Sequence, residues 1–457
     1  MLDKDSLKIL LEALERLDAG FAELPEFKTY SVDASRLEEV LGATADRLQD
    51  NYPYFHPLYA GQMLKPPHPV ARLAYALAQW INPNNHALDG GRATSTMERE
   101  AVAGLAGMFG WSEHLGHLCG GGTMANLEAL WVAGQLVPGK RILASEQAHY
   151  THGRISGVLQ LPFAAVPCDA RGRMDIGKLR EEISRGDVGT VVASMGTTAT
   201  GSVDPLAEIL GLGEKHGFRV HADAAYGGYF GLAANLGEVA RHEFDVLCRA
   251  DSIVIDPHKH GLQPYGCGCV LFREPAVGRL YRHDSPFTYF SSQELHLGEI
   301  SLECSRPGAS AAALWATQQM LPLTRGGEFA RGLEDCRSAA LDLYSRLQED
   351  ARYVTAFPPE LDIVVFAPQA ESVSEASELS RKIFNAVARR NLHLAVARLP
   401  VKFFAANLGD MRQDRTTITC LRSVLMKPEH REWVGRIWEL LVEATDECLK
   451  RRAGIGN

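Results

Sequence analysis

The sequence Asp251-Ser-Ile-Val-Ile-Asp-Pro-His-Lys-His260 joins a short run of β-branched residues to a histidine and a lysine. The run Ile253-Val-Ile255 predicts a buried strand, and the Pro-His pair that follows predicts its end. Lys259 would then lie beside His258 at the polar end of that strand. A lysine partly withdrawn from water in this way is suited to form a Schiff base with an aldehyde.

A glycine turn precedes a predicted helix earlier in the chain, at Gly120-Gly-Gly-Thr123. Such a turn leaves backbone N–H groups and the positive end of the helix dipole facing outward, where they can bind a phosphate. The turn lacks the Gly-Lys-Ser/Thr of a nucleotide-binding loop and the Gly-x-Gly-x-x-Gly dinucleotide pattern. Taken alone, it is also compatible with a tight turn that binds nothing.

Asp223 ends the predicted strand Phe218-Arg-Val-His-Ala-Asp223. A buried carboxylate needs a cationic partner, and a protonated pyridine nitrogen would be one. A helix cap or an ion pair with an arginine is the alternative. The glycine turn, Asp223 and the strand-end lysine, in this order along the chain, together predict a site for pyridoxal 5'-phosphate.

Two further polar residues follow predicted strands. His149 could stack on a planar ring or make a structural hydrogen bond, and Thr197 could contact a ring or belong to a turn. Neither residue decides between these roles without the rest of the site.

Composition excludes several classes of function. Of the 457 residues 46% are hydrophobic and 23% charged, and the formal net charge of −9 argues against nucleic-acid or anionic-membrane partners. No apolar run reaches the roughly 18 residues of a membrane-spanning helix, and the start of the chain lacks a signal-peptide core. Nine cysteines without paired spacing argue against disulfides and favour the cytoplasm. Cys267-Gly-Cys269 lacks a second pair that would complete a zinc site, so no metal is expected.

Short apolar runs alternate with helical ones from about residue 98 to 272, which predicts an α/β fold with a mostly parallel seven-stranded sheet flanked by helices. Ligands of such sheets bind at the carboxyl ends of strands. We expect an N-terminal helical segment over 1–75, a large cofactor-binding domain over 76–320 and a smaller α+β domain over 321–457. The predicted strands are His117–Cys119, Arg141–Ala144, Ala164–Val166, Thr190–Ser194, Arg219–Ala222, Ser252–Ile255 and Cys269–Phe272, with Leu361–Phe366 and Thr416–Leu421 in the last domain.

Three motifs resemble those of the group II pyridoxal-phosphate-dependent amino acid decarboxylases, which have the aspartate-aminotransferase-like fold type I. They are Asp256-Pro-His-Lys-His-Gly-Leu-Gln-Pro-Tyr265, His221-Ala-Asp-Ala-Ala-Tyr-Gly-Gly228 and Leu302-Glu-Cys-Ser-Arg-Pro-Gly308. The resemblance extends roughly over 51–329, with a weaker match near 421–422. Within the family, the chain looks most like tyrosine and other aromatic amino acid decarboxylases.

The resemblance implies a role for each matching residue. Lys259 would be the Schiff-base lysine, Asp223 the partner of the ring nitrogen and His149 the residue stacked on the ring. The remaining implied roles are phosphate contacts for Gly122, Thr123 and His258, a ring-edge contact for Thr197, substrate contacts for Ser95 and Arg422, and proton return to the substrate for Tyr265. Arg422 is equally compatible with a structural role, and His149 is the alternative proton donor. Asp256 departs from the pattern, because some relatives carry a phosphate-binding asparagine there.

The same resemblance implies that the chain decarboxylates an L-amino acid, with an aromatic one such as tyrosine favoured. It also implies a homodimer with active sites at the interface, and an apolar helix face from Leu7 to Leu17 gives a local reason for dimerisation. The alternatives are decarboxylation of an acidic amino acid such as glutamate and a carbon–carbon lyase of the sphingosine-phosphate lyase type.

Overall fold

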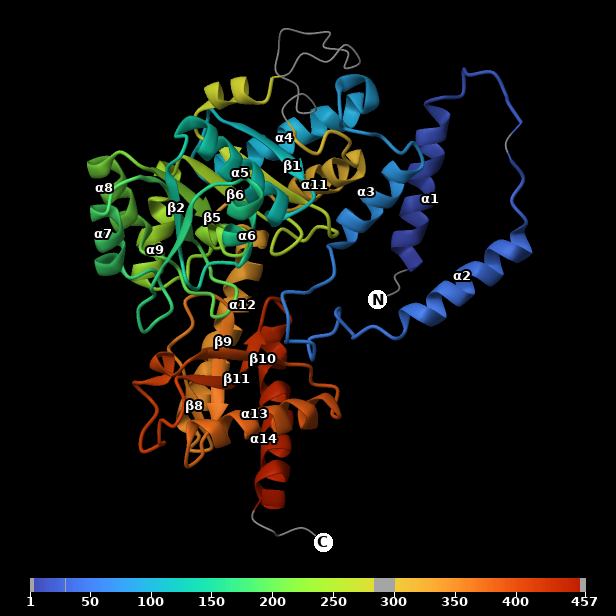
Figure 1. Ribbon diagram of the computed structural model, residues 1–457. Coiled ribbons are helices and arrows are strands. Elements are labelled where there is room, and N and C mark those ends of the chain that lie inside the picture. Colours follow the sequence, from blue (N-terminus) through green and yellow to red (C-terminus); the bar gives the residue numbers. More distant parts are fainter. Residues whose placement is uncertain (1–3, 29, 283–300, 453–457) are drawn as a thin grey trace.

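The computed structural model describes residues 4–28, 30–282 and 301–452 (Figure 1). The chain begins with two amphipathic helices: α1 (Lys4–Ala19) lies beside α3 (Pro69–Gln79), whereas α2 (Ala34–Leu48) stands away from the main body. No residue of either helix is buried against the rest of the described chain. Leu7 on α1 and Leu41 on α2 are more than half exposed, whereas Leu10, Leu14 and Leu17 are partly buried. The predicted helix face therefore exists and is only partly covered within the described chain.

A seven-stranded sheet forms the centre of the large part of the molecule, in the order β1-β7-β6-β5-β4-β2-β3. β7 runs antiparallel to both of its neighbours, and the other neighbouring pairs are parallel. All seven predicted strands and the mostly parallel sheet are therefore confirmed. The strands are β1 (Leu115–Cys119), β2 (Arg141–Ser145), β3 (Phe163–Val166), β4 (Val188–Ser194), β5 (Arg219–Asp223), β6 (Ser252–Ile255) and β7 (Gly268–Phe272).

Helices cover both faces of this sheet. Successive residues of a strand point to opposite sides, so a strand that is apolar throughout must pack against helices on both faces. On β4, Val192 packs in one apolar cluster with Leu130 of α5, whereas Val191 packs in another with Ile209 of α8. The helices of this part are α3 (Pro69–Gln79), α4 (Arg92–Met108), α5 (Gly122–Leu136), α6 (Thr151–Val158), α7 (Ile176–Ser184), α8 (Leu206–His216), α9 (Glu238–Asp245) and α11 (Gly308–Met320). Short 3-10 helices span Leu88–Gly90, Gly228–Leu232, Leu247–Arg249, Pro275–Leu280 and, in the C-terminal part, Val401–Phe404.

The C-terminal part has an antiparallel sheet of four strands in the order β10-β11-β9-β8, packed against three helices (Figure 1). Its elements are α12 (Glu328–Glu349), β8 (Tyr353–Thr355), β9 (Ile363–Pro368), α13 (Val373–Ala388), β10 (Ala395–Pro400), β11 (Thr417–Val424) and α14 (His430–Arg452). The sequence predicted β9 and β11 but not β8 and β10. β8 has three residues and β10 is a half-exposed edge strand, so neither carries a strong apolar pattern.

The predicted domain boundary at residue 321 falls between α11 and α12. The predicted large domain includes residues 283–300, which lie outside the described residues. Within the described ranges, no helix combines the length and the apolarity needed to cross a membrane.

Candidate active site

A cavity of about 460 Å³ opens at the carboxyl edge of the large sheet. The ends of β2, β4, β5 and β6 meet there because these strands are parallel, and the end of β1 joins them. Every residue predicted to contact the cofactor lines this cavity: Gly122, Thr123, His149, Thr197, Asp223, His258 and Lys259.

The glycine turn forms the start of α5 on one side of the cavity. Gly121 has a φ of +138°, a conformation that favours glycine, and a Cβ atom there would lie 3.2 Å from His258. A Cβ atom on Gly122 would lie 2.7 Å from the Asp256 carboxylate. Within the described part of the chain, no side chain caps this helix. Its first N–H groups therefore remain available to an anion such as a phosphate.

Asp223 presents a buried carboxylate at the end of β5. Its Oδ2 lies 2.8 Å from Nε2 of His152, and its Oδ1 accepts the N–H of Ala225 at 3.2 Å. Burial alone would raise the pKa of Asp223, but the hydrogen bond with His152 and the charge of Lys259 hold it well below its usual range. The carboxylate is therefore ionised and suited to pair with a cation.

His152 was missed by the sequence analysis. It lies on α6, three residues after His149, and its side chain is almost fully buried. A second histidine one helical turn after the first was the available signal, but only the fold directs it to a carboxylate 71 residues away.

Lys259 lines the cavity, with its Nζ 3.0 Å from Oδ2 of Asp256. Asp256 is 2% exposed, and its Oδ1 has no hydrogen-bond partner among the residues that the structure describes. His258 contacts the carbonyl oxygen of Cys267 through Nδ1 at 2.9 Å, and burial lowers its pKa, so its ring is neutral at pH 7.

His149 follows β2 and contacts the hydroxyl of Thr151 through Nδ1. Burial lowers the pKa of His149, which leaves a flat, neutral ring at the cavity. Thr197 follows β4, and its hydroxyl lies 2.9 Å from that of Thr200 and accepts the N–H of Ser202. Thr197 thus takes part in a turn while also lining the cavity.

A family model described as the pyridoxal-dependent decarboxylase conserved domain matches residues 131–369, just over half of the chain. A probable L-tyrosine/L-aspartate decarboxylase of Methanothermobacter thermautotrophicus is 30% identical over 329 residues, which cover 70% of this chain and 85% of that protein. The chain belongs to the pyridoxal-dependent decarboxylase family. An L-tyrosine decarboxylase of Enterococcus faecium is 29% identical, with 65% of each protein covered.

Solved structures give the same fold for this decarboxylase. Mouse CSAD in its apo form matches with a TM-score of 0.76 at 20% identity, covering 96% of this chain and 99% of that one. Oryza sativa TDC with PLP and tryptamine matches with a TM-score of 0.77 at 18% identity, covering 98% and 99%. The family assignment confirms that the chain is an enzyme and that pyridoxal phosphate is its cofactor.

The cavity of this decarboxylase fits that cofactor. Two buried oxygen atoms that line it, Oδ1 of Asp256 and Oγ of Ser194, have no partner within the described ranges, so a bound group has polar atoms to meet. The cavity offers one group for each part of the cofactor. The uncapped helix start suits the phosphate, the ionised carboxylate suits a protonated ring nitrogen, and the lysine amine suits the aldehyde.

Three predicted residues lie outside the lining of the cavity. Ser95 is buried on α4. Arg422, on β11, donates from its guanidinium to the carbonyl oxygens of Ala199, Thr198 and Gly61 at 2.7–3.1 Å. These bonds fix the loop after β4, which favours the structural role for Arg422. A substrate contact for Ser95 or Arg422 stays a prediction.

Tyr265, the third, is half-exposed and donates its hydroxyl to the carbonyl oxygen of Met63 at 3.0 Å. Its ring centroid lies 4.9 Å from that of His258, so it stands next to the lysine loop. Burial raises the pKa of Tyr265 to about 12, which keeps its phenol protonated at pH 7.

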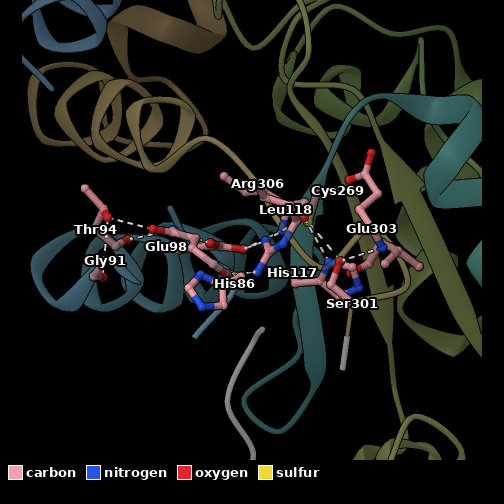
Figure 2. A network of polar contacts seen from close by, with 12 residues as sticks. His86, Gly91, Thr94, Glu98, His117, Leu118, Cys269, Ser301, Glu303 and Arg306 are labelled. Carbon is pink, nitrogen blue, oxygen red and sulfur yellow. Dashed lines mark hydrogen bonds and ion pairs between the residues drawn. The ribbon is translucent and has the colours of Figure 1, made fainter. Parts of the chain in front are cut away.

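A buried ion pair between Arg306 and Glu98 lies beside Leu118 in β1, just before the glycine turn (Figure 2). Arg306 contacts the carboxylate of Glu98 and donates to the carbonyl oxygen of Leu118 at 2.8 Å. Glu98 in turn accepts the N–H of Leu118 at 2.9 Å. The end of β1 is therefore held just before the turn begins. Arg306 lies in the quoted motif Leu302–Gly308, whereas the sequence analysis did not single out Glu98.

Proposed function

We propose that this decarboxylase releases carbon dioxide from an aromatic L-amino acid such as tyrosine and forms the corresponding amine. One observation carries the proposal: a single cavity brings together the amine of Lys259, the ionised carboxylate of Asp223 and the uncapped start of α5. The names of the relatives from M. thermautotrophicus and E. faecium support the substrate class.

The charge of the cavity favours a neutral side chain on the substrate. Its described lining contains three carboxylates, Asp223, Asp256 and Glu303, and Lys259 is the only lysine or arginine in it. An acidic side chain would add another negative charge, and a phosphorylated substrate of a carbon–carbon lyase would need further cations. Because relatives are named for both tyrosine and aspartate, aspartate is the second candidate substrate.

Pyridoxal phosphate, when bound, supplies an aldehyde for amines and a ring that withdraws electrons from the bond to the leaving carboxylate. Lys259 would hold the aldehyde end and the N–H groups of Gly122 and Thr123 the phosphate. Asp223 would keep a proton on the ring nitrogen, since its carboxylate is ionised and oriented by His152. The neutral imidazole of His149 would cover one face of the ring.

Proton return to Cα of the substrate is the role that we propose for Tyr265. Its phenol carries a proton at pH 7, and its ring adjoins His258, next to Lys259 in the chain. In the structure that proton is donated to Met63, so Tyr265 must exchange this bond for one to the substrate. His149 is the other candidate donor.

We further propose that the enzyme is a cytoplasmic homodimer with its active sites at the subunit interface. The uncovered apolar face of α2 and the partly covered face of α1 support this, because an amphipathic helix is stable when its apolar face is buried. All nine cysteines are free thiols, which agrees with a reducing compartment.

The test begins with carbon dioxide release from each of the twenty amino acids, where tyrosine is expected to be the best or among the best substrates. Borohydride reduction of the loaded enzyme, followed by peptide mapping, should place the cofactor on Lys259, and Lys259→Ala should carry no adduct. An adduct on another lysine would refute the assignment of the site. Release from no amino acid would refute the proposed reaction.

A further inference from the structure

A carboxylate occupies the turn that should receive the cofactor phosphate. Oε2 of Glu303 accepts the N–H of Gly120 at 2.9 Å, and both residues line the cavity. A Cβ atom on Gly120 would lie 2.7 Å from Oε1 of the same side chain, so the contact is close. An anion thus already binds the first N–H of the glycine turn.

The backbone around Glu303 holds this side chain in place. Three residues later, Arg306 is anchored to Glu98 and to the carbonyl oxygen of Leu118. Figure 2 shows the Glu303 side chain directed away from that ion pair, which leaves its charge without a cation there. Cys304, directly after it, has a φ of +61°, a left-handed conformation that is unfavourable for a residue with a side chain.

The neighbourhood contains little positive charge to offset Glu303. A second carboxylate, that of Asp256, lies against Gly122 of the turn. It is paired with Lys259, and Lys259 is the only lysine or arginine in the described lining, so no lysine or arginine of the lining is left for Glu303. The rings of His149 and His258 are neutral at pH 7, because burial lowers the pKa of both. A phosphate dianion that enters this cavity therefore meets negative charge on two sides of the turn.

We propose that Glu303 competes with the cofactor phosphate for the glycine turn. Binding of the cofactor must therefore displace this carboxylate or overcome its repulsion of the phosphate. The inference rests on the proposed function, since it takes the glycine turn, through the N–H groups of Gly122 and Thr123, as the phosphate site. Glu303 is then a residue that sets the affinity for pyridoxal phosphate, and in the cofactor-free chain its carboxylate stays bonded to the N–H of Gly120 beside the phosphate site.

Glu303→Gln tests the inference, because glutamine keeps the shape and an acceptor oxygen but removes the charge. The full chain, freed of cofactor, is titrated with pyridoxal phosphate, and binding is followed by absorbance. We expect the dissociation constant to fall about tenfold, the size of one nearby like charge at intermediate dielectric. Inorganic phosphate should also compete with the cofactor at lower concentration in the variant.

Two controls separate this effect from general ones. Pyridoxal, which lacks the phosphate, should bind the wild type and Glu303→Gln equally. Glu181→Gln removes one charge from the exposed surface of α7, outside the cavity. It should change neither the dissociation constant of pyridoxal phosphate nor that of pyridoxal. If Glu303→Gln does not fold, Glu303→Asp, whose shorter carboxylate reaches less far toward Gly120, should show a smaller gain.

The outcomes distinguish the two proposals. A wild type that never binds pyridoxal phosphate at Lys259 would overturn the proposed function and this inference with it. A wild type that loads normally, with an unchanged or weakened affinity in Glu303→Gln, would overturn only the role of Glu303. An equal gain for pyridoxal would also overturn it, because the effect would not involve the phosphate.

Discussion

Replacing Arg306 by methionine should destabilise the enzyme strongly through the charge that it leaves behind. The side chains of Arg306 and Glu98 are 4% and 1% exposed, so their ion pair is almost entirely out of water. In Arg306→Met, Glu98 keeps its hydrogen bonds from Asn85 and Leu118 but has no counter-charge. Breaking one side of a buried ion pair costs about 3–5 kcal/mol, and we expect the free energy of unfolding to fall by that amount.

The double variant Glu98→Gln/Arg306→Met shows whether charge is the cause. Because glutamine removes the stranded charge but keeps an acceptor for Leu118, the double variant should recover about 1–3 kcal/mol relative to Arg306→Met. Urea unfolding followed by circular dichroism, at one protein and one cofactor concentration, measures all three proteins. Arg325→Met, which removes an exposed ion pair with Asp245, is the matched control and should cost less than about 1 kcal/mol. A double variant no more stable than Arg306→Met would refute the reasoning.

Three further predictions concern the site and its pH dependence. Asp223→Ala should keep its circular dichroism spectrum but lose activity about a thousandfold, because the ring nitrogen loses its anionic partner; near-normal turnover would make Asp223 structural. Tyr265→Phe should still release carbon dioxide but form more aldehyde per carbon dioxide than the wild type, and an unchanged ratio and rate would shift proton return to His149. Burial lowers the pKa of His221 to about 3 in the folded chain, whereas a histidine in the unfolded chain has a pKa of about 6.5. As the pH falls, the unfolded chain therefore binds a proton at His221 before the folded chain does, which favours unfolding. The urea midpoint should therefore fall as the pH is lowered from about 6.5, less steeply in His221→Asn, and identical slopes would contradict this assignment.

The local sequence was sufficient to predict the strands of the large sheet and seven of the residues that line the cavity. Strands such as β6 are short and apolar on both faces, and a buried parallel strand needs no information beyond its own composition. Lys259, Asp223 and Gly122 each follow or end such a strand, and parallel strands place their carboxyl ends at one edge.

The partners of these residues were decided by the tertiary structure alone. His152 reaches Asp223 across 71 residues, Glu303 reaches Gly120 across 183 and Arg306 reaches Glu98 across 208. No periodicity in the sequence reports a contact at such a separation, because the pairing depends on the order in which the strands assemble.

The sequence by itself determined the sheet, the cofactor and the family, because these depend on short apolar runs and on motifs whose residues are neighbours in the chain. The charge balance of the site was decided only by the fold. It placed the carboxylates of Asp256 and Glu303 against the glycine turn and directed the guanidinium of Arg422 to backbone carbonyl groups. The physical reason is that the energy of a charge depends on its burial and on every nearby charge, and these are properties of the packed molecule rather than of any segment.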